Sequence, residues 1–222
     1  MRELPDTRVH RLRERQRFGP EPLERVLADG FVAHVGFIRD GHPVVLPFLY
    51  GVGDLGDGRG RQLLLHGSNG GGLFLDAREA GVEVCVTVTH VDSLVLAVST
   101  FDSSADYRSA AIFGHASAVP AELKADALRI ISEHVIPGRN SEIRDMTHHE
   151  IRQTQVLRLS LDHASVKARE GGIADAADDG EDHAVWSGVV PLAVRAGTPV
   201  TSQATEAPVP DSVRALVARL NS

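Results

Sequence analysis

The chain has 222 residues, of which 42% are hydrophobic and 24% charged, a composition typical of one globular domain with a full core. A formal net charge of −7 argues against a broad nucleic-acid-binding surface, because neutralising phosphates requires clustered Lys and Arg. Cys85 is the single cysteine, which excludes an intrachain disulfide, and no apolar run is long enough to span a membrane. We therefore expect a cytoplasmic protein that binds neither nucleic acid nor a membrane.

The N-terminal half is predicted to form strands after a basic arm. The arm carries arginines at positions 8, 11, 13, 15 and 17 and is typical of a solvated or partner-contacting segment. Residues 31–38 and 42–50 flank an Asp-Gly turn and favour a hairpin. A third strand is predicted over 61–68. Residues 82–91 and 94–100 predict a second hairpin, with its turn at Asp92-Ser93.

The C-terminal half mixes strands and helices. A long strand is predicted over 107–119, with a bend at Gly114, and another over 155–169. Helices are predicted over 120–136, 141–153 and 211–220. A Gly/Asp-rich loop covers 171–182, and order resumes over 184–194. The pattern indicates a mainly β protein with peripheral helices. The residues of 84–89 alternate between aliphatic and small or polar, which suits a sheet closed into a barrel.

The stretch LLLHGSNGGGLFLDARE, residues 63–79, is the clearest candidate for a ligand site. A strand ends at His66, a Gly-rich turn follows, and a helix begins near Leu73. The turn is neither a Walker loop, because no Lys-Ser or Lys-Thr follows the glycines, nor a dinucleotide-binding fingerprint, because its neighbours are hairpins. Free backbone N–H groups and the Ser68 hydroxyl could hold a phosphate. A plain structural turn is the alternative.

Other motifs leave their interpretation open. The run His148-His149-Glu150 lacks a second His at helical spacing, so no metal site is expected there. No G-x-S-x-G motif supports a hydrolase. Tyr107-Arg108-Ser109 is compatible with a strand-edge contact or with a clamp for phosphate or carboxylate. Trp186, the single Trp, is compatible with a core or interface anchor.

Four stretches, taken together and in this order, resemble the flavin-nucleotide-binding family related to pyridoxamine 5′-phosphate oxidase, in the branch that includes nitroimidazole-resistance proteins. They are HVGFIRDGHPVVLPFLY, LLLHGSNGGGLFLDAREAGVEVCVTVTHVDSLVLA, DYRSAAIFGHA and VWSGVVPL. The similarity runs from about Arg8 to Leu192. The string from His66 to Ala97, followed by Tyr-Arg-Ser and Trp-x-Gly-Val, is specific as a set rather than piece by piece.

The resemblance implies a split β-barrel of six or more antiparallel strands over residues 1–195, with a C-terminal extension at 196–222. It also implies a homodimer that binds FMN between its subunits. The residues that it would place around FMN lie on two strands, one turn and the C-terminal segment: Val45, Leu46, Pro47, Phe48, His66, Gly67, Ser68, Asn69, Tyr107, Arg108, Ser109 and Trp186.

One departure from the family concerns the phosphate. Relatives commonly carry Ser, Arg or Lys shortly after the His-Gly-Ser turn, whereas this chain has Gly70, Gly71 and Gly72. The direct charge partner is missing there, and Arg78 or Arg108 could supply it.

Two hypotheses of different class follow. The first is an FMN-dependent oxidoreductase that reduces a small electrophile such as a nitroaromatic compound, with His66 and Tyr107 as the nearest proton donors. The second is a non-catalytic binder of a flavin, a deazaflavin or a haem. Histidines on or beside strands could ligate a haem iron, and these are His34, His42, His66, His90 and His115.

Overall fold

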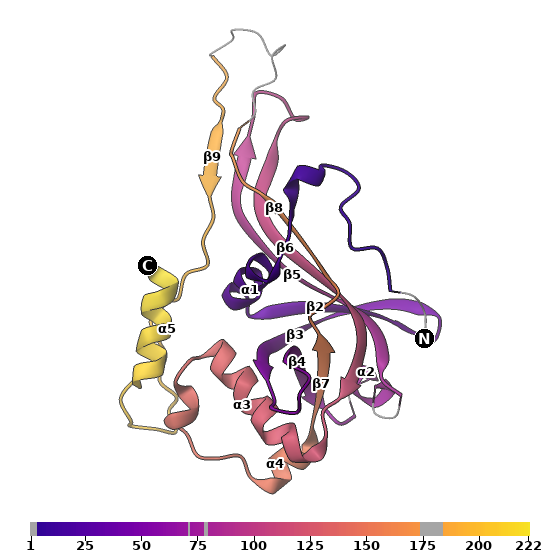
Figure 1. Ribbon diagram of the computed structural model, residues 1–222. Coiled ribbons are helices and arrows are strands. Elements are labelled where there is room, and N and C mark those ends of the chain that lie inside the picture. Colours follow the sequence, from indigo (N-terminus) through magenta and orange to yellow (C-terminus); the bar gives the residue numbers. More distant parts are fainter. Residues whose placement is uncertain (1–3, 71, 78–79, 174–183) are drawn as a thin grey trace.

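A closed antiparallel barrel forms the centre of the computed structural model, which describes residues 4–70, 72–77, 80–173 and 184–222. The nine strands in these residues follow the order β1-β8-β6-β7-β4-β3-β2-β5-β9, and β5 also pairs with β6. This pairing closes β6, β7, β4, β3, β2 and β5 into a ring (Figure 1). The predicted mainly β class, with six or more antiparallel strands, is confirmed.

The elements have the following bounds. The strands are β1 Gln16–Arg17, β2 Val32–Arg39, β3 His42–Asp54, β4 Arg61–Ser68, β5 Val82–Leu96, β6 Ser104–Ala118, β7 Thr154–Ser160, β8 Ala164–Arg169 and β9 Gly188–Pro191. The helices are α1 Pro20–Asp29, α2 Gly72–Asp76, α3 Lys124–Val135, α4 His148–Gln153 and α5 Asp211–Asn221, with 3-10 turns η1 Arg13–Arg15, η2 Ala121–Leu123 and η3 Arg139–Ser141.

The β2–β3 hairpin matches its sequence signal. Asp40 and Gly41 both have positive φ, 50° and 76°, as a two-residue turn of the primed type requires. Asp tolerates this conformation better than most residues, and Gly adopts it without steric cost. The turn fixes the register, in which Arg39 lies opposite His42 and Val32 opposite Leu49.

The predicted turn at Asp92-Ser93 is wrong. Strand β5 continues through both residues to Leu96, and the register with β6 shifts between Val91 and Ser93, which marks a bulge. The side chains of this bulge bond to β6, because Ser93 donates to Asp106 and Asp92 accepts from Arg108. The hairpin reverses further out, between Leu96 and Ser104. The longer β5–β6 arm therefore projects beyond the barrel, with β9 alongside it (Figure 1).

Four other local predictions need correction. The predicted strand 155–169 is two strands, β7 and β8, that flank a short turn. The predicted helix 141–153 is a 3-10 turn followed by α4, whose Thr147 cap and Glu150 form a reciprocal capping box. Strand β6 passes regularly through Gly114, where a Cβ atom would lie 2.8 Å from Leu159 Cδ1; close packing rather than a bend explains this glycine. Helix α1 was not predicted, although Pro20 and Gly30 bracket it.

The barrel interior holds the main core, and α3 covers one outer face. Buried residues of every barrel strand fill the interior, among them Val35, Tyr50, Leu65, Val86 and Ile112. A second cluster joins the outer face to α3 through Leu64, Val156, Ala127 and Ile131. Gly51 makes this approach possible, because a Cβ atom there would lie 2.7 Å from Ile131 Cα.

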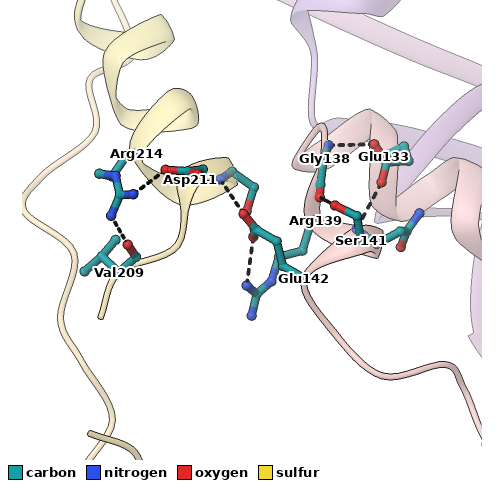
Figure 2. Close-up of polar contacts among 10 residues, drawn as sticks. Glu133, Gly138, Arg139, Ser141, Glu142, Val209, Asp211 and Arg214 are labelled. Atoms are coloured by element: carbon teal, nitrogen blue, oxygen red, sulfur yellow. Dashed lines mark hydrogen bonds and ion pairs between the residues drawn. The ribbon is translucent and has the colours of Figure 1, made fainter. Parts of the chain in front are cut away.

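The C-terminal segment runs along the barrel and ends in α5, which docks near η3. Glu142 accepts hydrogen bonds from the backbone N–H and the hydroxyl of Ser212, in the first turn of α5. Figure 2 shows Glu142 in contact with Arg139 as well, and Arg214 with Asp211 and Val209. The predicted helix at 211–220 is confirmed, and the domain division at residue 195 stays a prediction. No helix in the described ranges has both the length and the apolar content to cross a bilayer.

Candidate functional site

The turn that follows β4 borders an open pocket of about 640 Å³. The pocket is lined by His66, Gly67, Ser68, Asn69, Gln153 and Thr154. The backbone N–H of Asn69 donates to Gln153 at 3.2 Å, and its side-chain amide donates to Arg152, so this residue ties the turn to the end of α4. Among the described residues, the Ser68 hydroxyl has one weak partner, the Gly70 N–H at 3.4 Å. It is therefore available to a ligand.

Gly67 lets this turn pack tightly on the barrel. A Cβ atom at residue 67 would collide with the ring of Phe74 in α2. The same ring meets Phe48 of β3 edge to face, with centroids 5.4 Å apart. Phe74 therefore packs between β3 and the turn. These two parts of the predicted site are not paired directly, because the β3–β4 pairing ends at Tyr50 and Leu65. The sequence-predicted residues 45–48 and 66–69 lie beside one bridging ring.

Strand β3 presents apolar side chains to solvent in its first half. Val45 is 63% exposed and Leu46 37%, and Pro47 is also exposed. Apolar residues exposed side by side on a strand mark a surface that another molecule covers. Phe48, in contrast, packs against the main core.

His66 is a half-buried imidazole on the outer side of β4. Burial lowers the pKa of His66 below its ordinary value, because desolvation disfavours the charged form. The ring is therefore neutral at neutral pH, able to donate one hydrogen bond and to accept another. Such a group can orient a ligand but carries no charge to offset a phosphate.

Arg39, which was not predicted from the sequence as a site residue, places a guanidinium at this turn. Arg39, the last residue of β2, donates to one carboxylate oxygen of Asp76 from Nε at 3.1 Å and from Nη2 at 2.8 Å. The head group occupies the space beside Gly72, where a Cβ atom would collide with it. Its place at a hairpin end, next to Asp40 and Gly41, gave no sequence signal of a ligand contact. Of the cations named from the sequence, Arg78 lies outside the described residues.

Arg108 is committed elsewhere. It forms a two-pronged ion pair with Asp92, at 2.9 and 3.0 Å, and a further one with Asp29 at 2.6 Å. These bonds, first those with Asp92, raise the pKa of Arg108 above its already high ordinary value. The neighbouring Ser109 hydroxyl donates to the Lys167 carbonyl at 3.2 Å, and Tyr107 is half-buried on the same strand. Within one chain the structure joins these three residues to β5 and β8 rather than to the turn.

Trp186 lies just before β9, on the outer arm. It is 65% exposed, and its ring packs against Gly188. Strand β9 pairs with Val95 and Leu96 near the far end of β5, so Trp186 is remote from the turn after β4 within one chain.

The exposed surface of β3 continues across the outer faces of β2 and β5. Val32, His34, Gly36 and Ile38 alternate outward on β2, opposite Leu49, Pro47, Val45 and Pro43. Thr87 and Cys85 continue the rows on β5. His34, in the middle, makes no hydrogen bond to any described residue and is exposed. We call this surface the β2 face. No group of three or more His, Cys, Asp and Glu side chains among the described residues is arranged to bind a metal.

Comparisons with known proteins place this architecture in a family. The family model described as pyridoxamine 5′-phosphate oxidase matches residues 20–168, about two thirds of the chain. The chain belongs to this family. No curated protein matches the chain.

Two solved structures are similar over nearly the whole length. The FAD and haem binding protein from Mycobacterium smegmatis is 36% identical, with a TM-score of 0.83 over 91% of this chain and 97% of that one. The flavocytochrome Anf3 from Azotobacter vinelandii is 30% identical, with a TM-score of 0.81 over 94% and 95%. A proposed 5-nitroimidazole resistance protein from Bacteroides thetaiotaomicron, 21% identical with a TM-score of 0.53 over 70% and 90%, shares the fold.

Proposed function

We propose that this protein binds a flavin nucleotide along β3, with the phosphate end at the turn after β4, and uses it as a redox group. The observation that carries the proposal is the exposed apolar stretch from Val45 to Pro47 beside a turn that offers the Ser68 hydroxyl. An apolar ring system and an anionic tail are the two halves of a flavin nucleotide. Membership of the family supports the same assignment.

The flavin expected from the sequence resemblance was FMN, whereas the M. smegmatis relative is described as binding FAD. The Gly-rich turn suits either nucleotide, since Gly70 has no described atom within 4 Å of a Cβ position and leaves space at the turn. Whether the protein binds FMN or FAD is therefore a question for experiment. It is read directly from the cofactor released by the purified protein.

A homodimer completes the proposed site. The β2 face carries exposed apolar side chains on two adjacent strands, including Ile38 of β2 at 64% and Val45 of β3 at 63% exposure. A second copy of the chain would bury this face through a twofold interface. Trp186 and Tyr107, remote from the turn within one chain, could then reach the partner's flavin.

Haem is the second candidate ligand, because the M. smegmatis structure is described as a FAD and haem binding protein and the A. vinelandii structure as a flavocytochrome. Four histidines among the described residues already contact backbone carbonyls through a ring nitrogen. Those whose Nε2 contacts a backbone carbonyl, at 2.6–2.9 Å, are His90, His115, His134 and His163. His34 has no such partner among the described residues and sits on an apolar face, next to a groove of about 370 Å³ that Gly36 and Cys85 help to line. That surface fits an apolar macrocycle with one imidazole ligand.

A flavin, when bound, would supply transfer of a hydride or of single electrons. The chain's own contribution is binding, orientation and exclusion of water. His66, neutral because of its burial, can hold one proton at a ring nitrogen and share it with a bound ligand. Reduction of a small electrophile follows from this chemistry, and the choice of substrate stays a prediction.

The test is the absorption spectrum of the purified protein, with chromatography of the cofactor released by heat. Flavin absorption bands would identify a bound flavin, and a Soret band would identify a haem. Chromatography of the released flavin beside FMN and FAD standards then distinguishes the two nucleotides. Protein that remains colourless after incubation with FMN, FAD and haemin would refute both candidates.

A further inference from the structure

Arg39 of β2 brings a guanidinium to Gly72, near the end of the turn that follows β4. Arg39 lies 33 positions before Gly72 in the chain, yet its guanidinium packs against that glycine. A Cβ atom at residue 72 would overlap Nη1, Nη2 and Cζ of Arg39. At Gly70, by contrast, a Cβ atom would meet no described atom within 4 Å. The two glycines therefore differ. The absence of a side chain at residue 72 makes room for the Arg39 guanidinium, whereas residue 70 borders open space.

The guanidinium is held in one orientation but is not saturated. Nε and Nη2 both donate to Oδ2 of Asp76, and the head group lies 5.5 Å from the Phe37 ring centroid. A guanidinium has five N–H donors, and this ion pair accounts for two of them. Nη1 makes no hydrogen bond to any described residue, and the side chain is 34% exposed. Asp76 thus orients Arg39 while the Nη1 edge remains open.

We infer that Arg39 binds a phosphate group of the flavin nucleotide, together with the Ser68 turn, and that it selects phosphorylated flavins over riboflavin. The inference rests on the proposed flavin site. Ser68 and Gly72 are four residues apart, which limits their separation to about 14 Å along the chain. A guanidinium fork is the side chain best matched to phosphate oxygens. Asp76 is then a positioning residue.

The experiment measures binding of riboflavin, FMN and FAD to the cofactor-free protein by quenching of flavin fluorescence. The parent should bind FMN, FAD or both more tightly than riboflavin. Arg39→Gln should weaken binding of the phosphorylated flavin by about tenfold to a hundredfold, the range for a hydrogen bond to a charged group, and leave riboflavin binding unchanged. Arg25→Gln, which removes a more exposed arginine from α1 and so changes the net charge by the same amount, is the control and should change neither.

A second pair of variants leaves Arg39 in place. Gly72→Ala inserts a methyl group against the guanidinium, whose flexible end can move, so the fold should be kept while the phosphate contact is lost. Gly70→Ala adds the same methyl group in open space and should have no effect. Weaker binding of the phosphorylated flavin in Gly72→Ala, with Gly70→Ala unchanged, is the expected pattern.

Failure of the inference differs from failure of the proposed function. If the parent prefers FMN or FAD but Arg39→Gln keeps that preference, or if the parent binds all three flavins equally, Arg39 does not read the phosphate. If the parent binds no flavin, the proposed function fails, and calorimetry with inorganic pyrophosphate then tests the anion site directly. Pyrophosphate binding that Arg39→Gln abolishes would support the anion site, and no binding to the parent would overturn it.

Discussion

The phenol of Tyr50 donates a 2.6 Å hydrogen bond to the backbone carbonyl of Leu27, near the end of α1. Tyr50 is fully buried on β3, and burial raises the pKa of its hydroxyl well above the ordinary value, so it stays protonated as a donor. Its ring also packs against His134 of α3 at 4.6 Å, and His134 contacts the Gly30 carbonyl at 2.9 Å. Two barrel-side groups thereby satisfy carbonyls where α1 ends.

Removal of the phenol should destabilise the fold. Tyr50→Phe leaves the Leu27 carbonyl buried without its partner, which costs about 1–3 kcal/mol of unfolding free energy. Urea unfolding followed by circular dichroism measures the change. Tyr107→Phe, at a half-buried position with no hydrogen bond to a described residue, is the matched control and should stay within about 0.5 kcal/mol. Equal loss in both variants would mean that the Leu27 bond is not what Tyr50 contributes.

His134 should make stability depend on pH. Burial is the main cause that lowers the pKa of His134 below 6.5; Arg219 acts in the same direction, and the Gly30 bond opposes it. The unfolded chain therefore binds a proton more readily than the folded one as pH falls below about 6.5. Stability is present in full above that pH and is lost as pH drops through the lower folded value.

Unfolding curves between pH 7.5 and 5 test this sign. His134→Gln should show a shallower fall in stability than the parent, whereas His10→Gln, at an exposed position, should follow the parent. Burial also lowers the pKa of His66, so part of the dependence of stability on pH should persist in every variant. Parallel curves for the parent and His134→Gln would assign the pH dependence to other groups.

The sequence predicted what depends on local pattern and missed what depends on contacts between distant segments. The Asp40-Gly41 turn was predictable because its backbone angles demand those residue types. Asp92-Ser93 carries an equally good turn signal but forms a bulge, because Arg108 and Asp106 on β6 bind its side chains. Local propensity cannot register partners that lie 13 to 16 residues away.

The candidate site shows the same division. The His66–Asn69 turn and the strand beside it were named from the chain, although their part in binding a cofactor stays a prediction. Arg39 was not named, since only the folded hairpin brings it to Gly72. Arg108 was named for its charge, but two carboxylates already hold it.

The β2 face predicts a homodimer that one charge should disrupt. Ile38→Lys places a cation on the β2 face, outside the proposed flavin-binding stretch, where its desolvation would oppose association. Analytical ultracentrifugation at low micromolar concentration should give a dimer of the 23.8 kDa chain for the parent and a monomer for the variant. Val200→Lys, at a position that is 96% exposed in the C-terminal segment, is the control and should remain dimeric. A parent that sediments as a monomer would disprove the interface.

His34 is the imidazole that we expect to ligate haem, if the protein binds one as the M. smegmatis FAD and haem binding protein is described to do. The reason is its position, since its side chain has no hydrogen-bond partner among the described residues, while four other histidines contact carbonyls through Nε2. Titration of the parent with haemin should give a Soret band shifted from that of free haemin. His34→Ala should lose the shift, and added imidazole should restore it by filling the vacated position. His42→Ala, a few residues away on β3, is the control and should keep the parent spectrum. A His34→Ala protein with the parent's Soret band would move the ligand to another histidine, with His66 the next to replace.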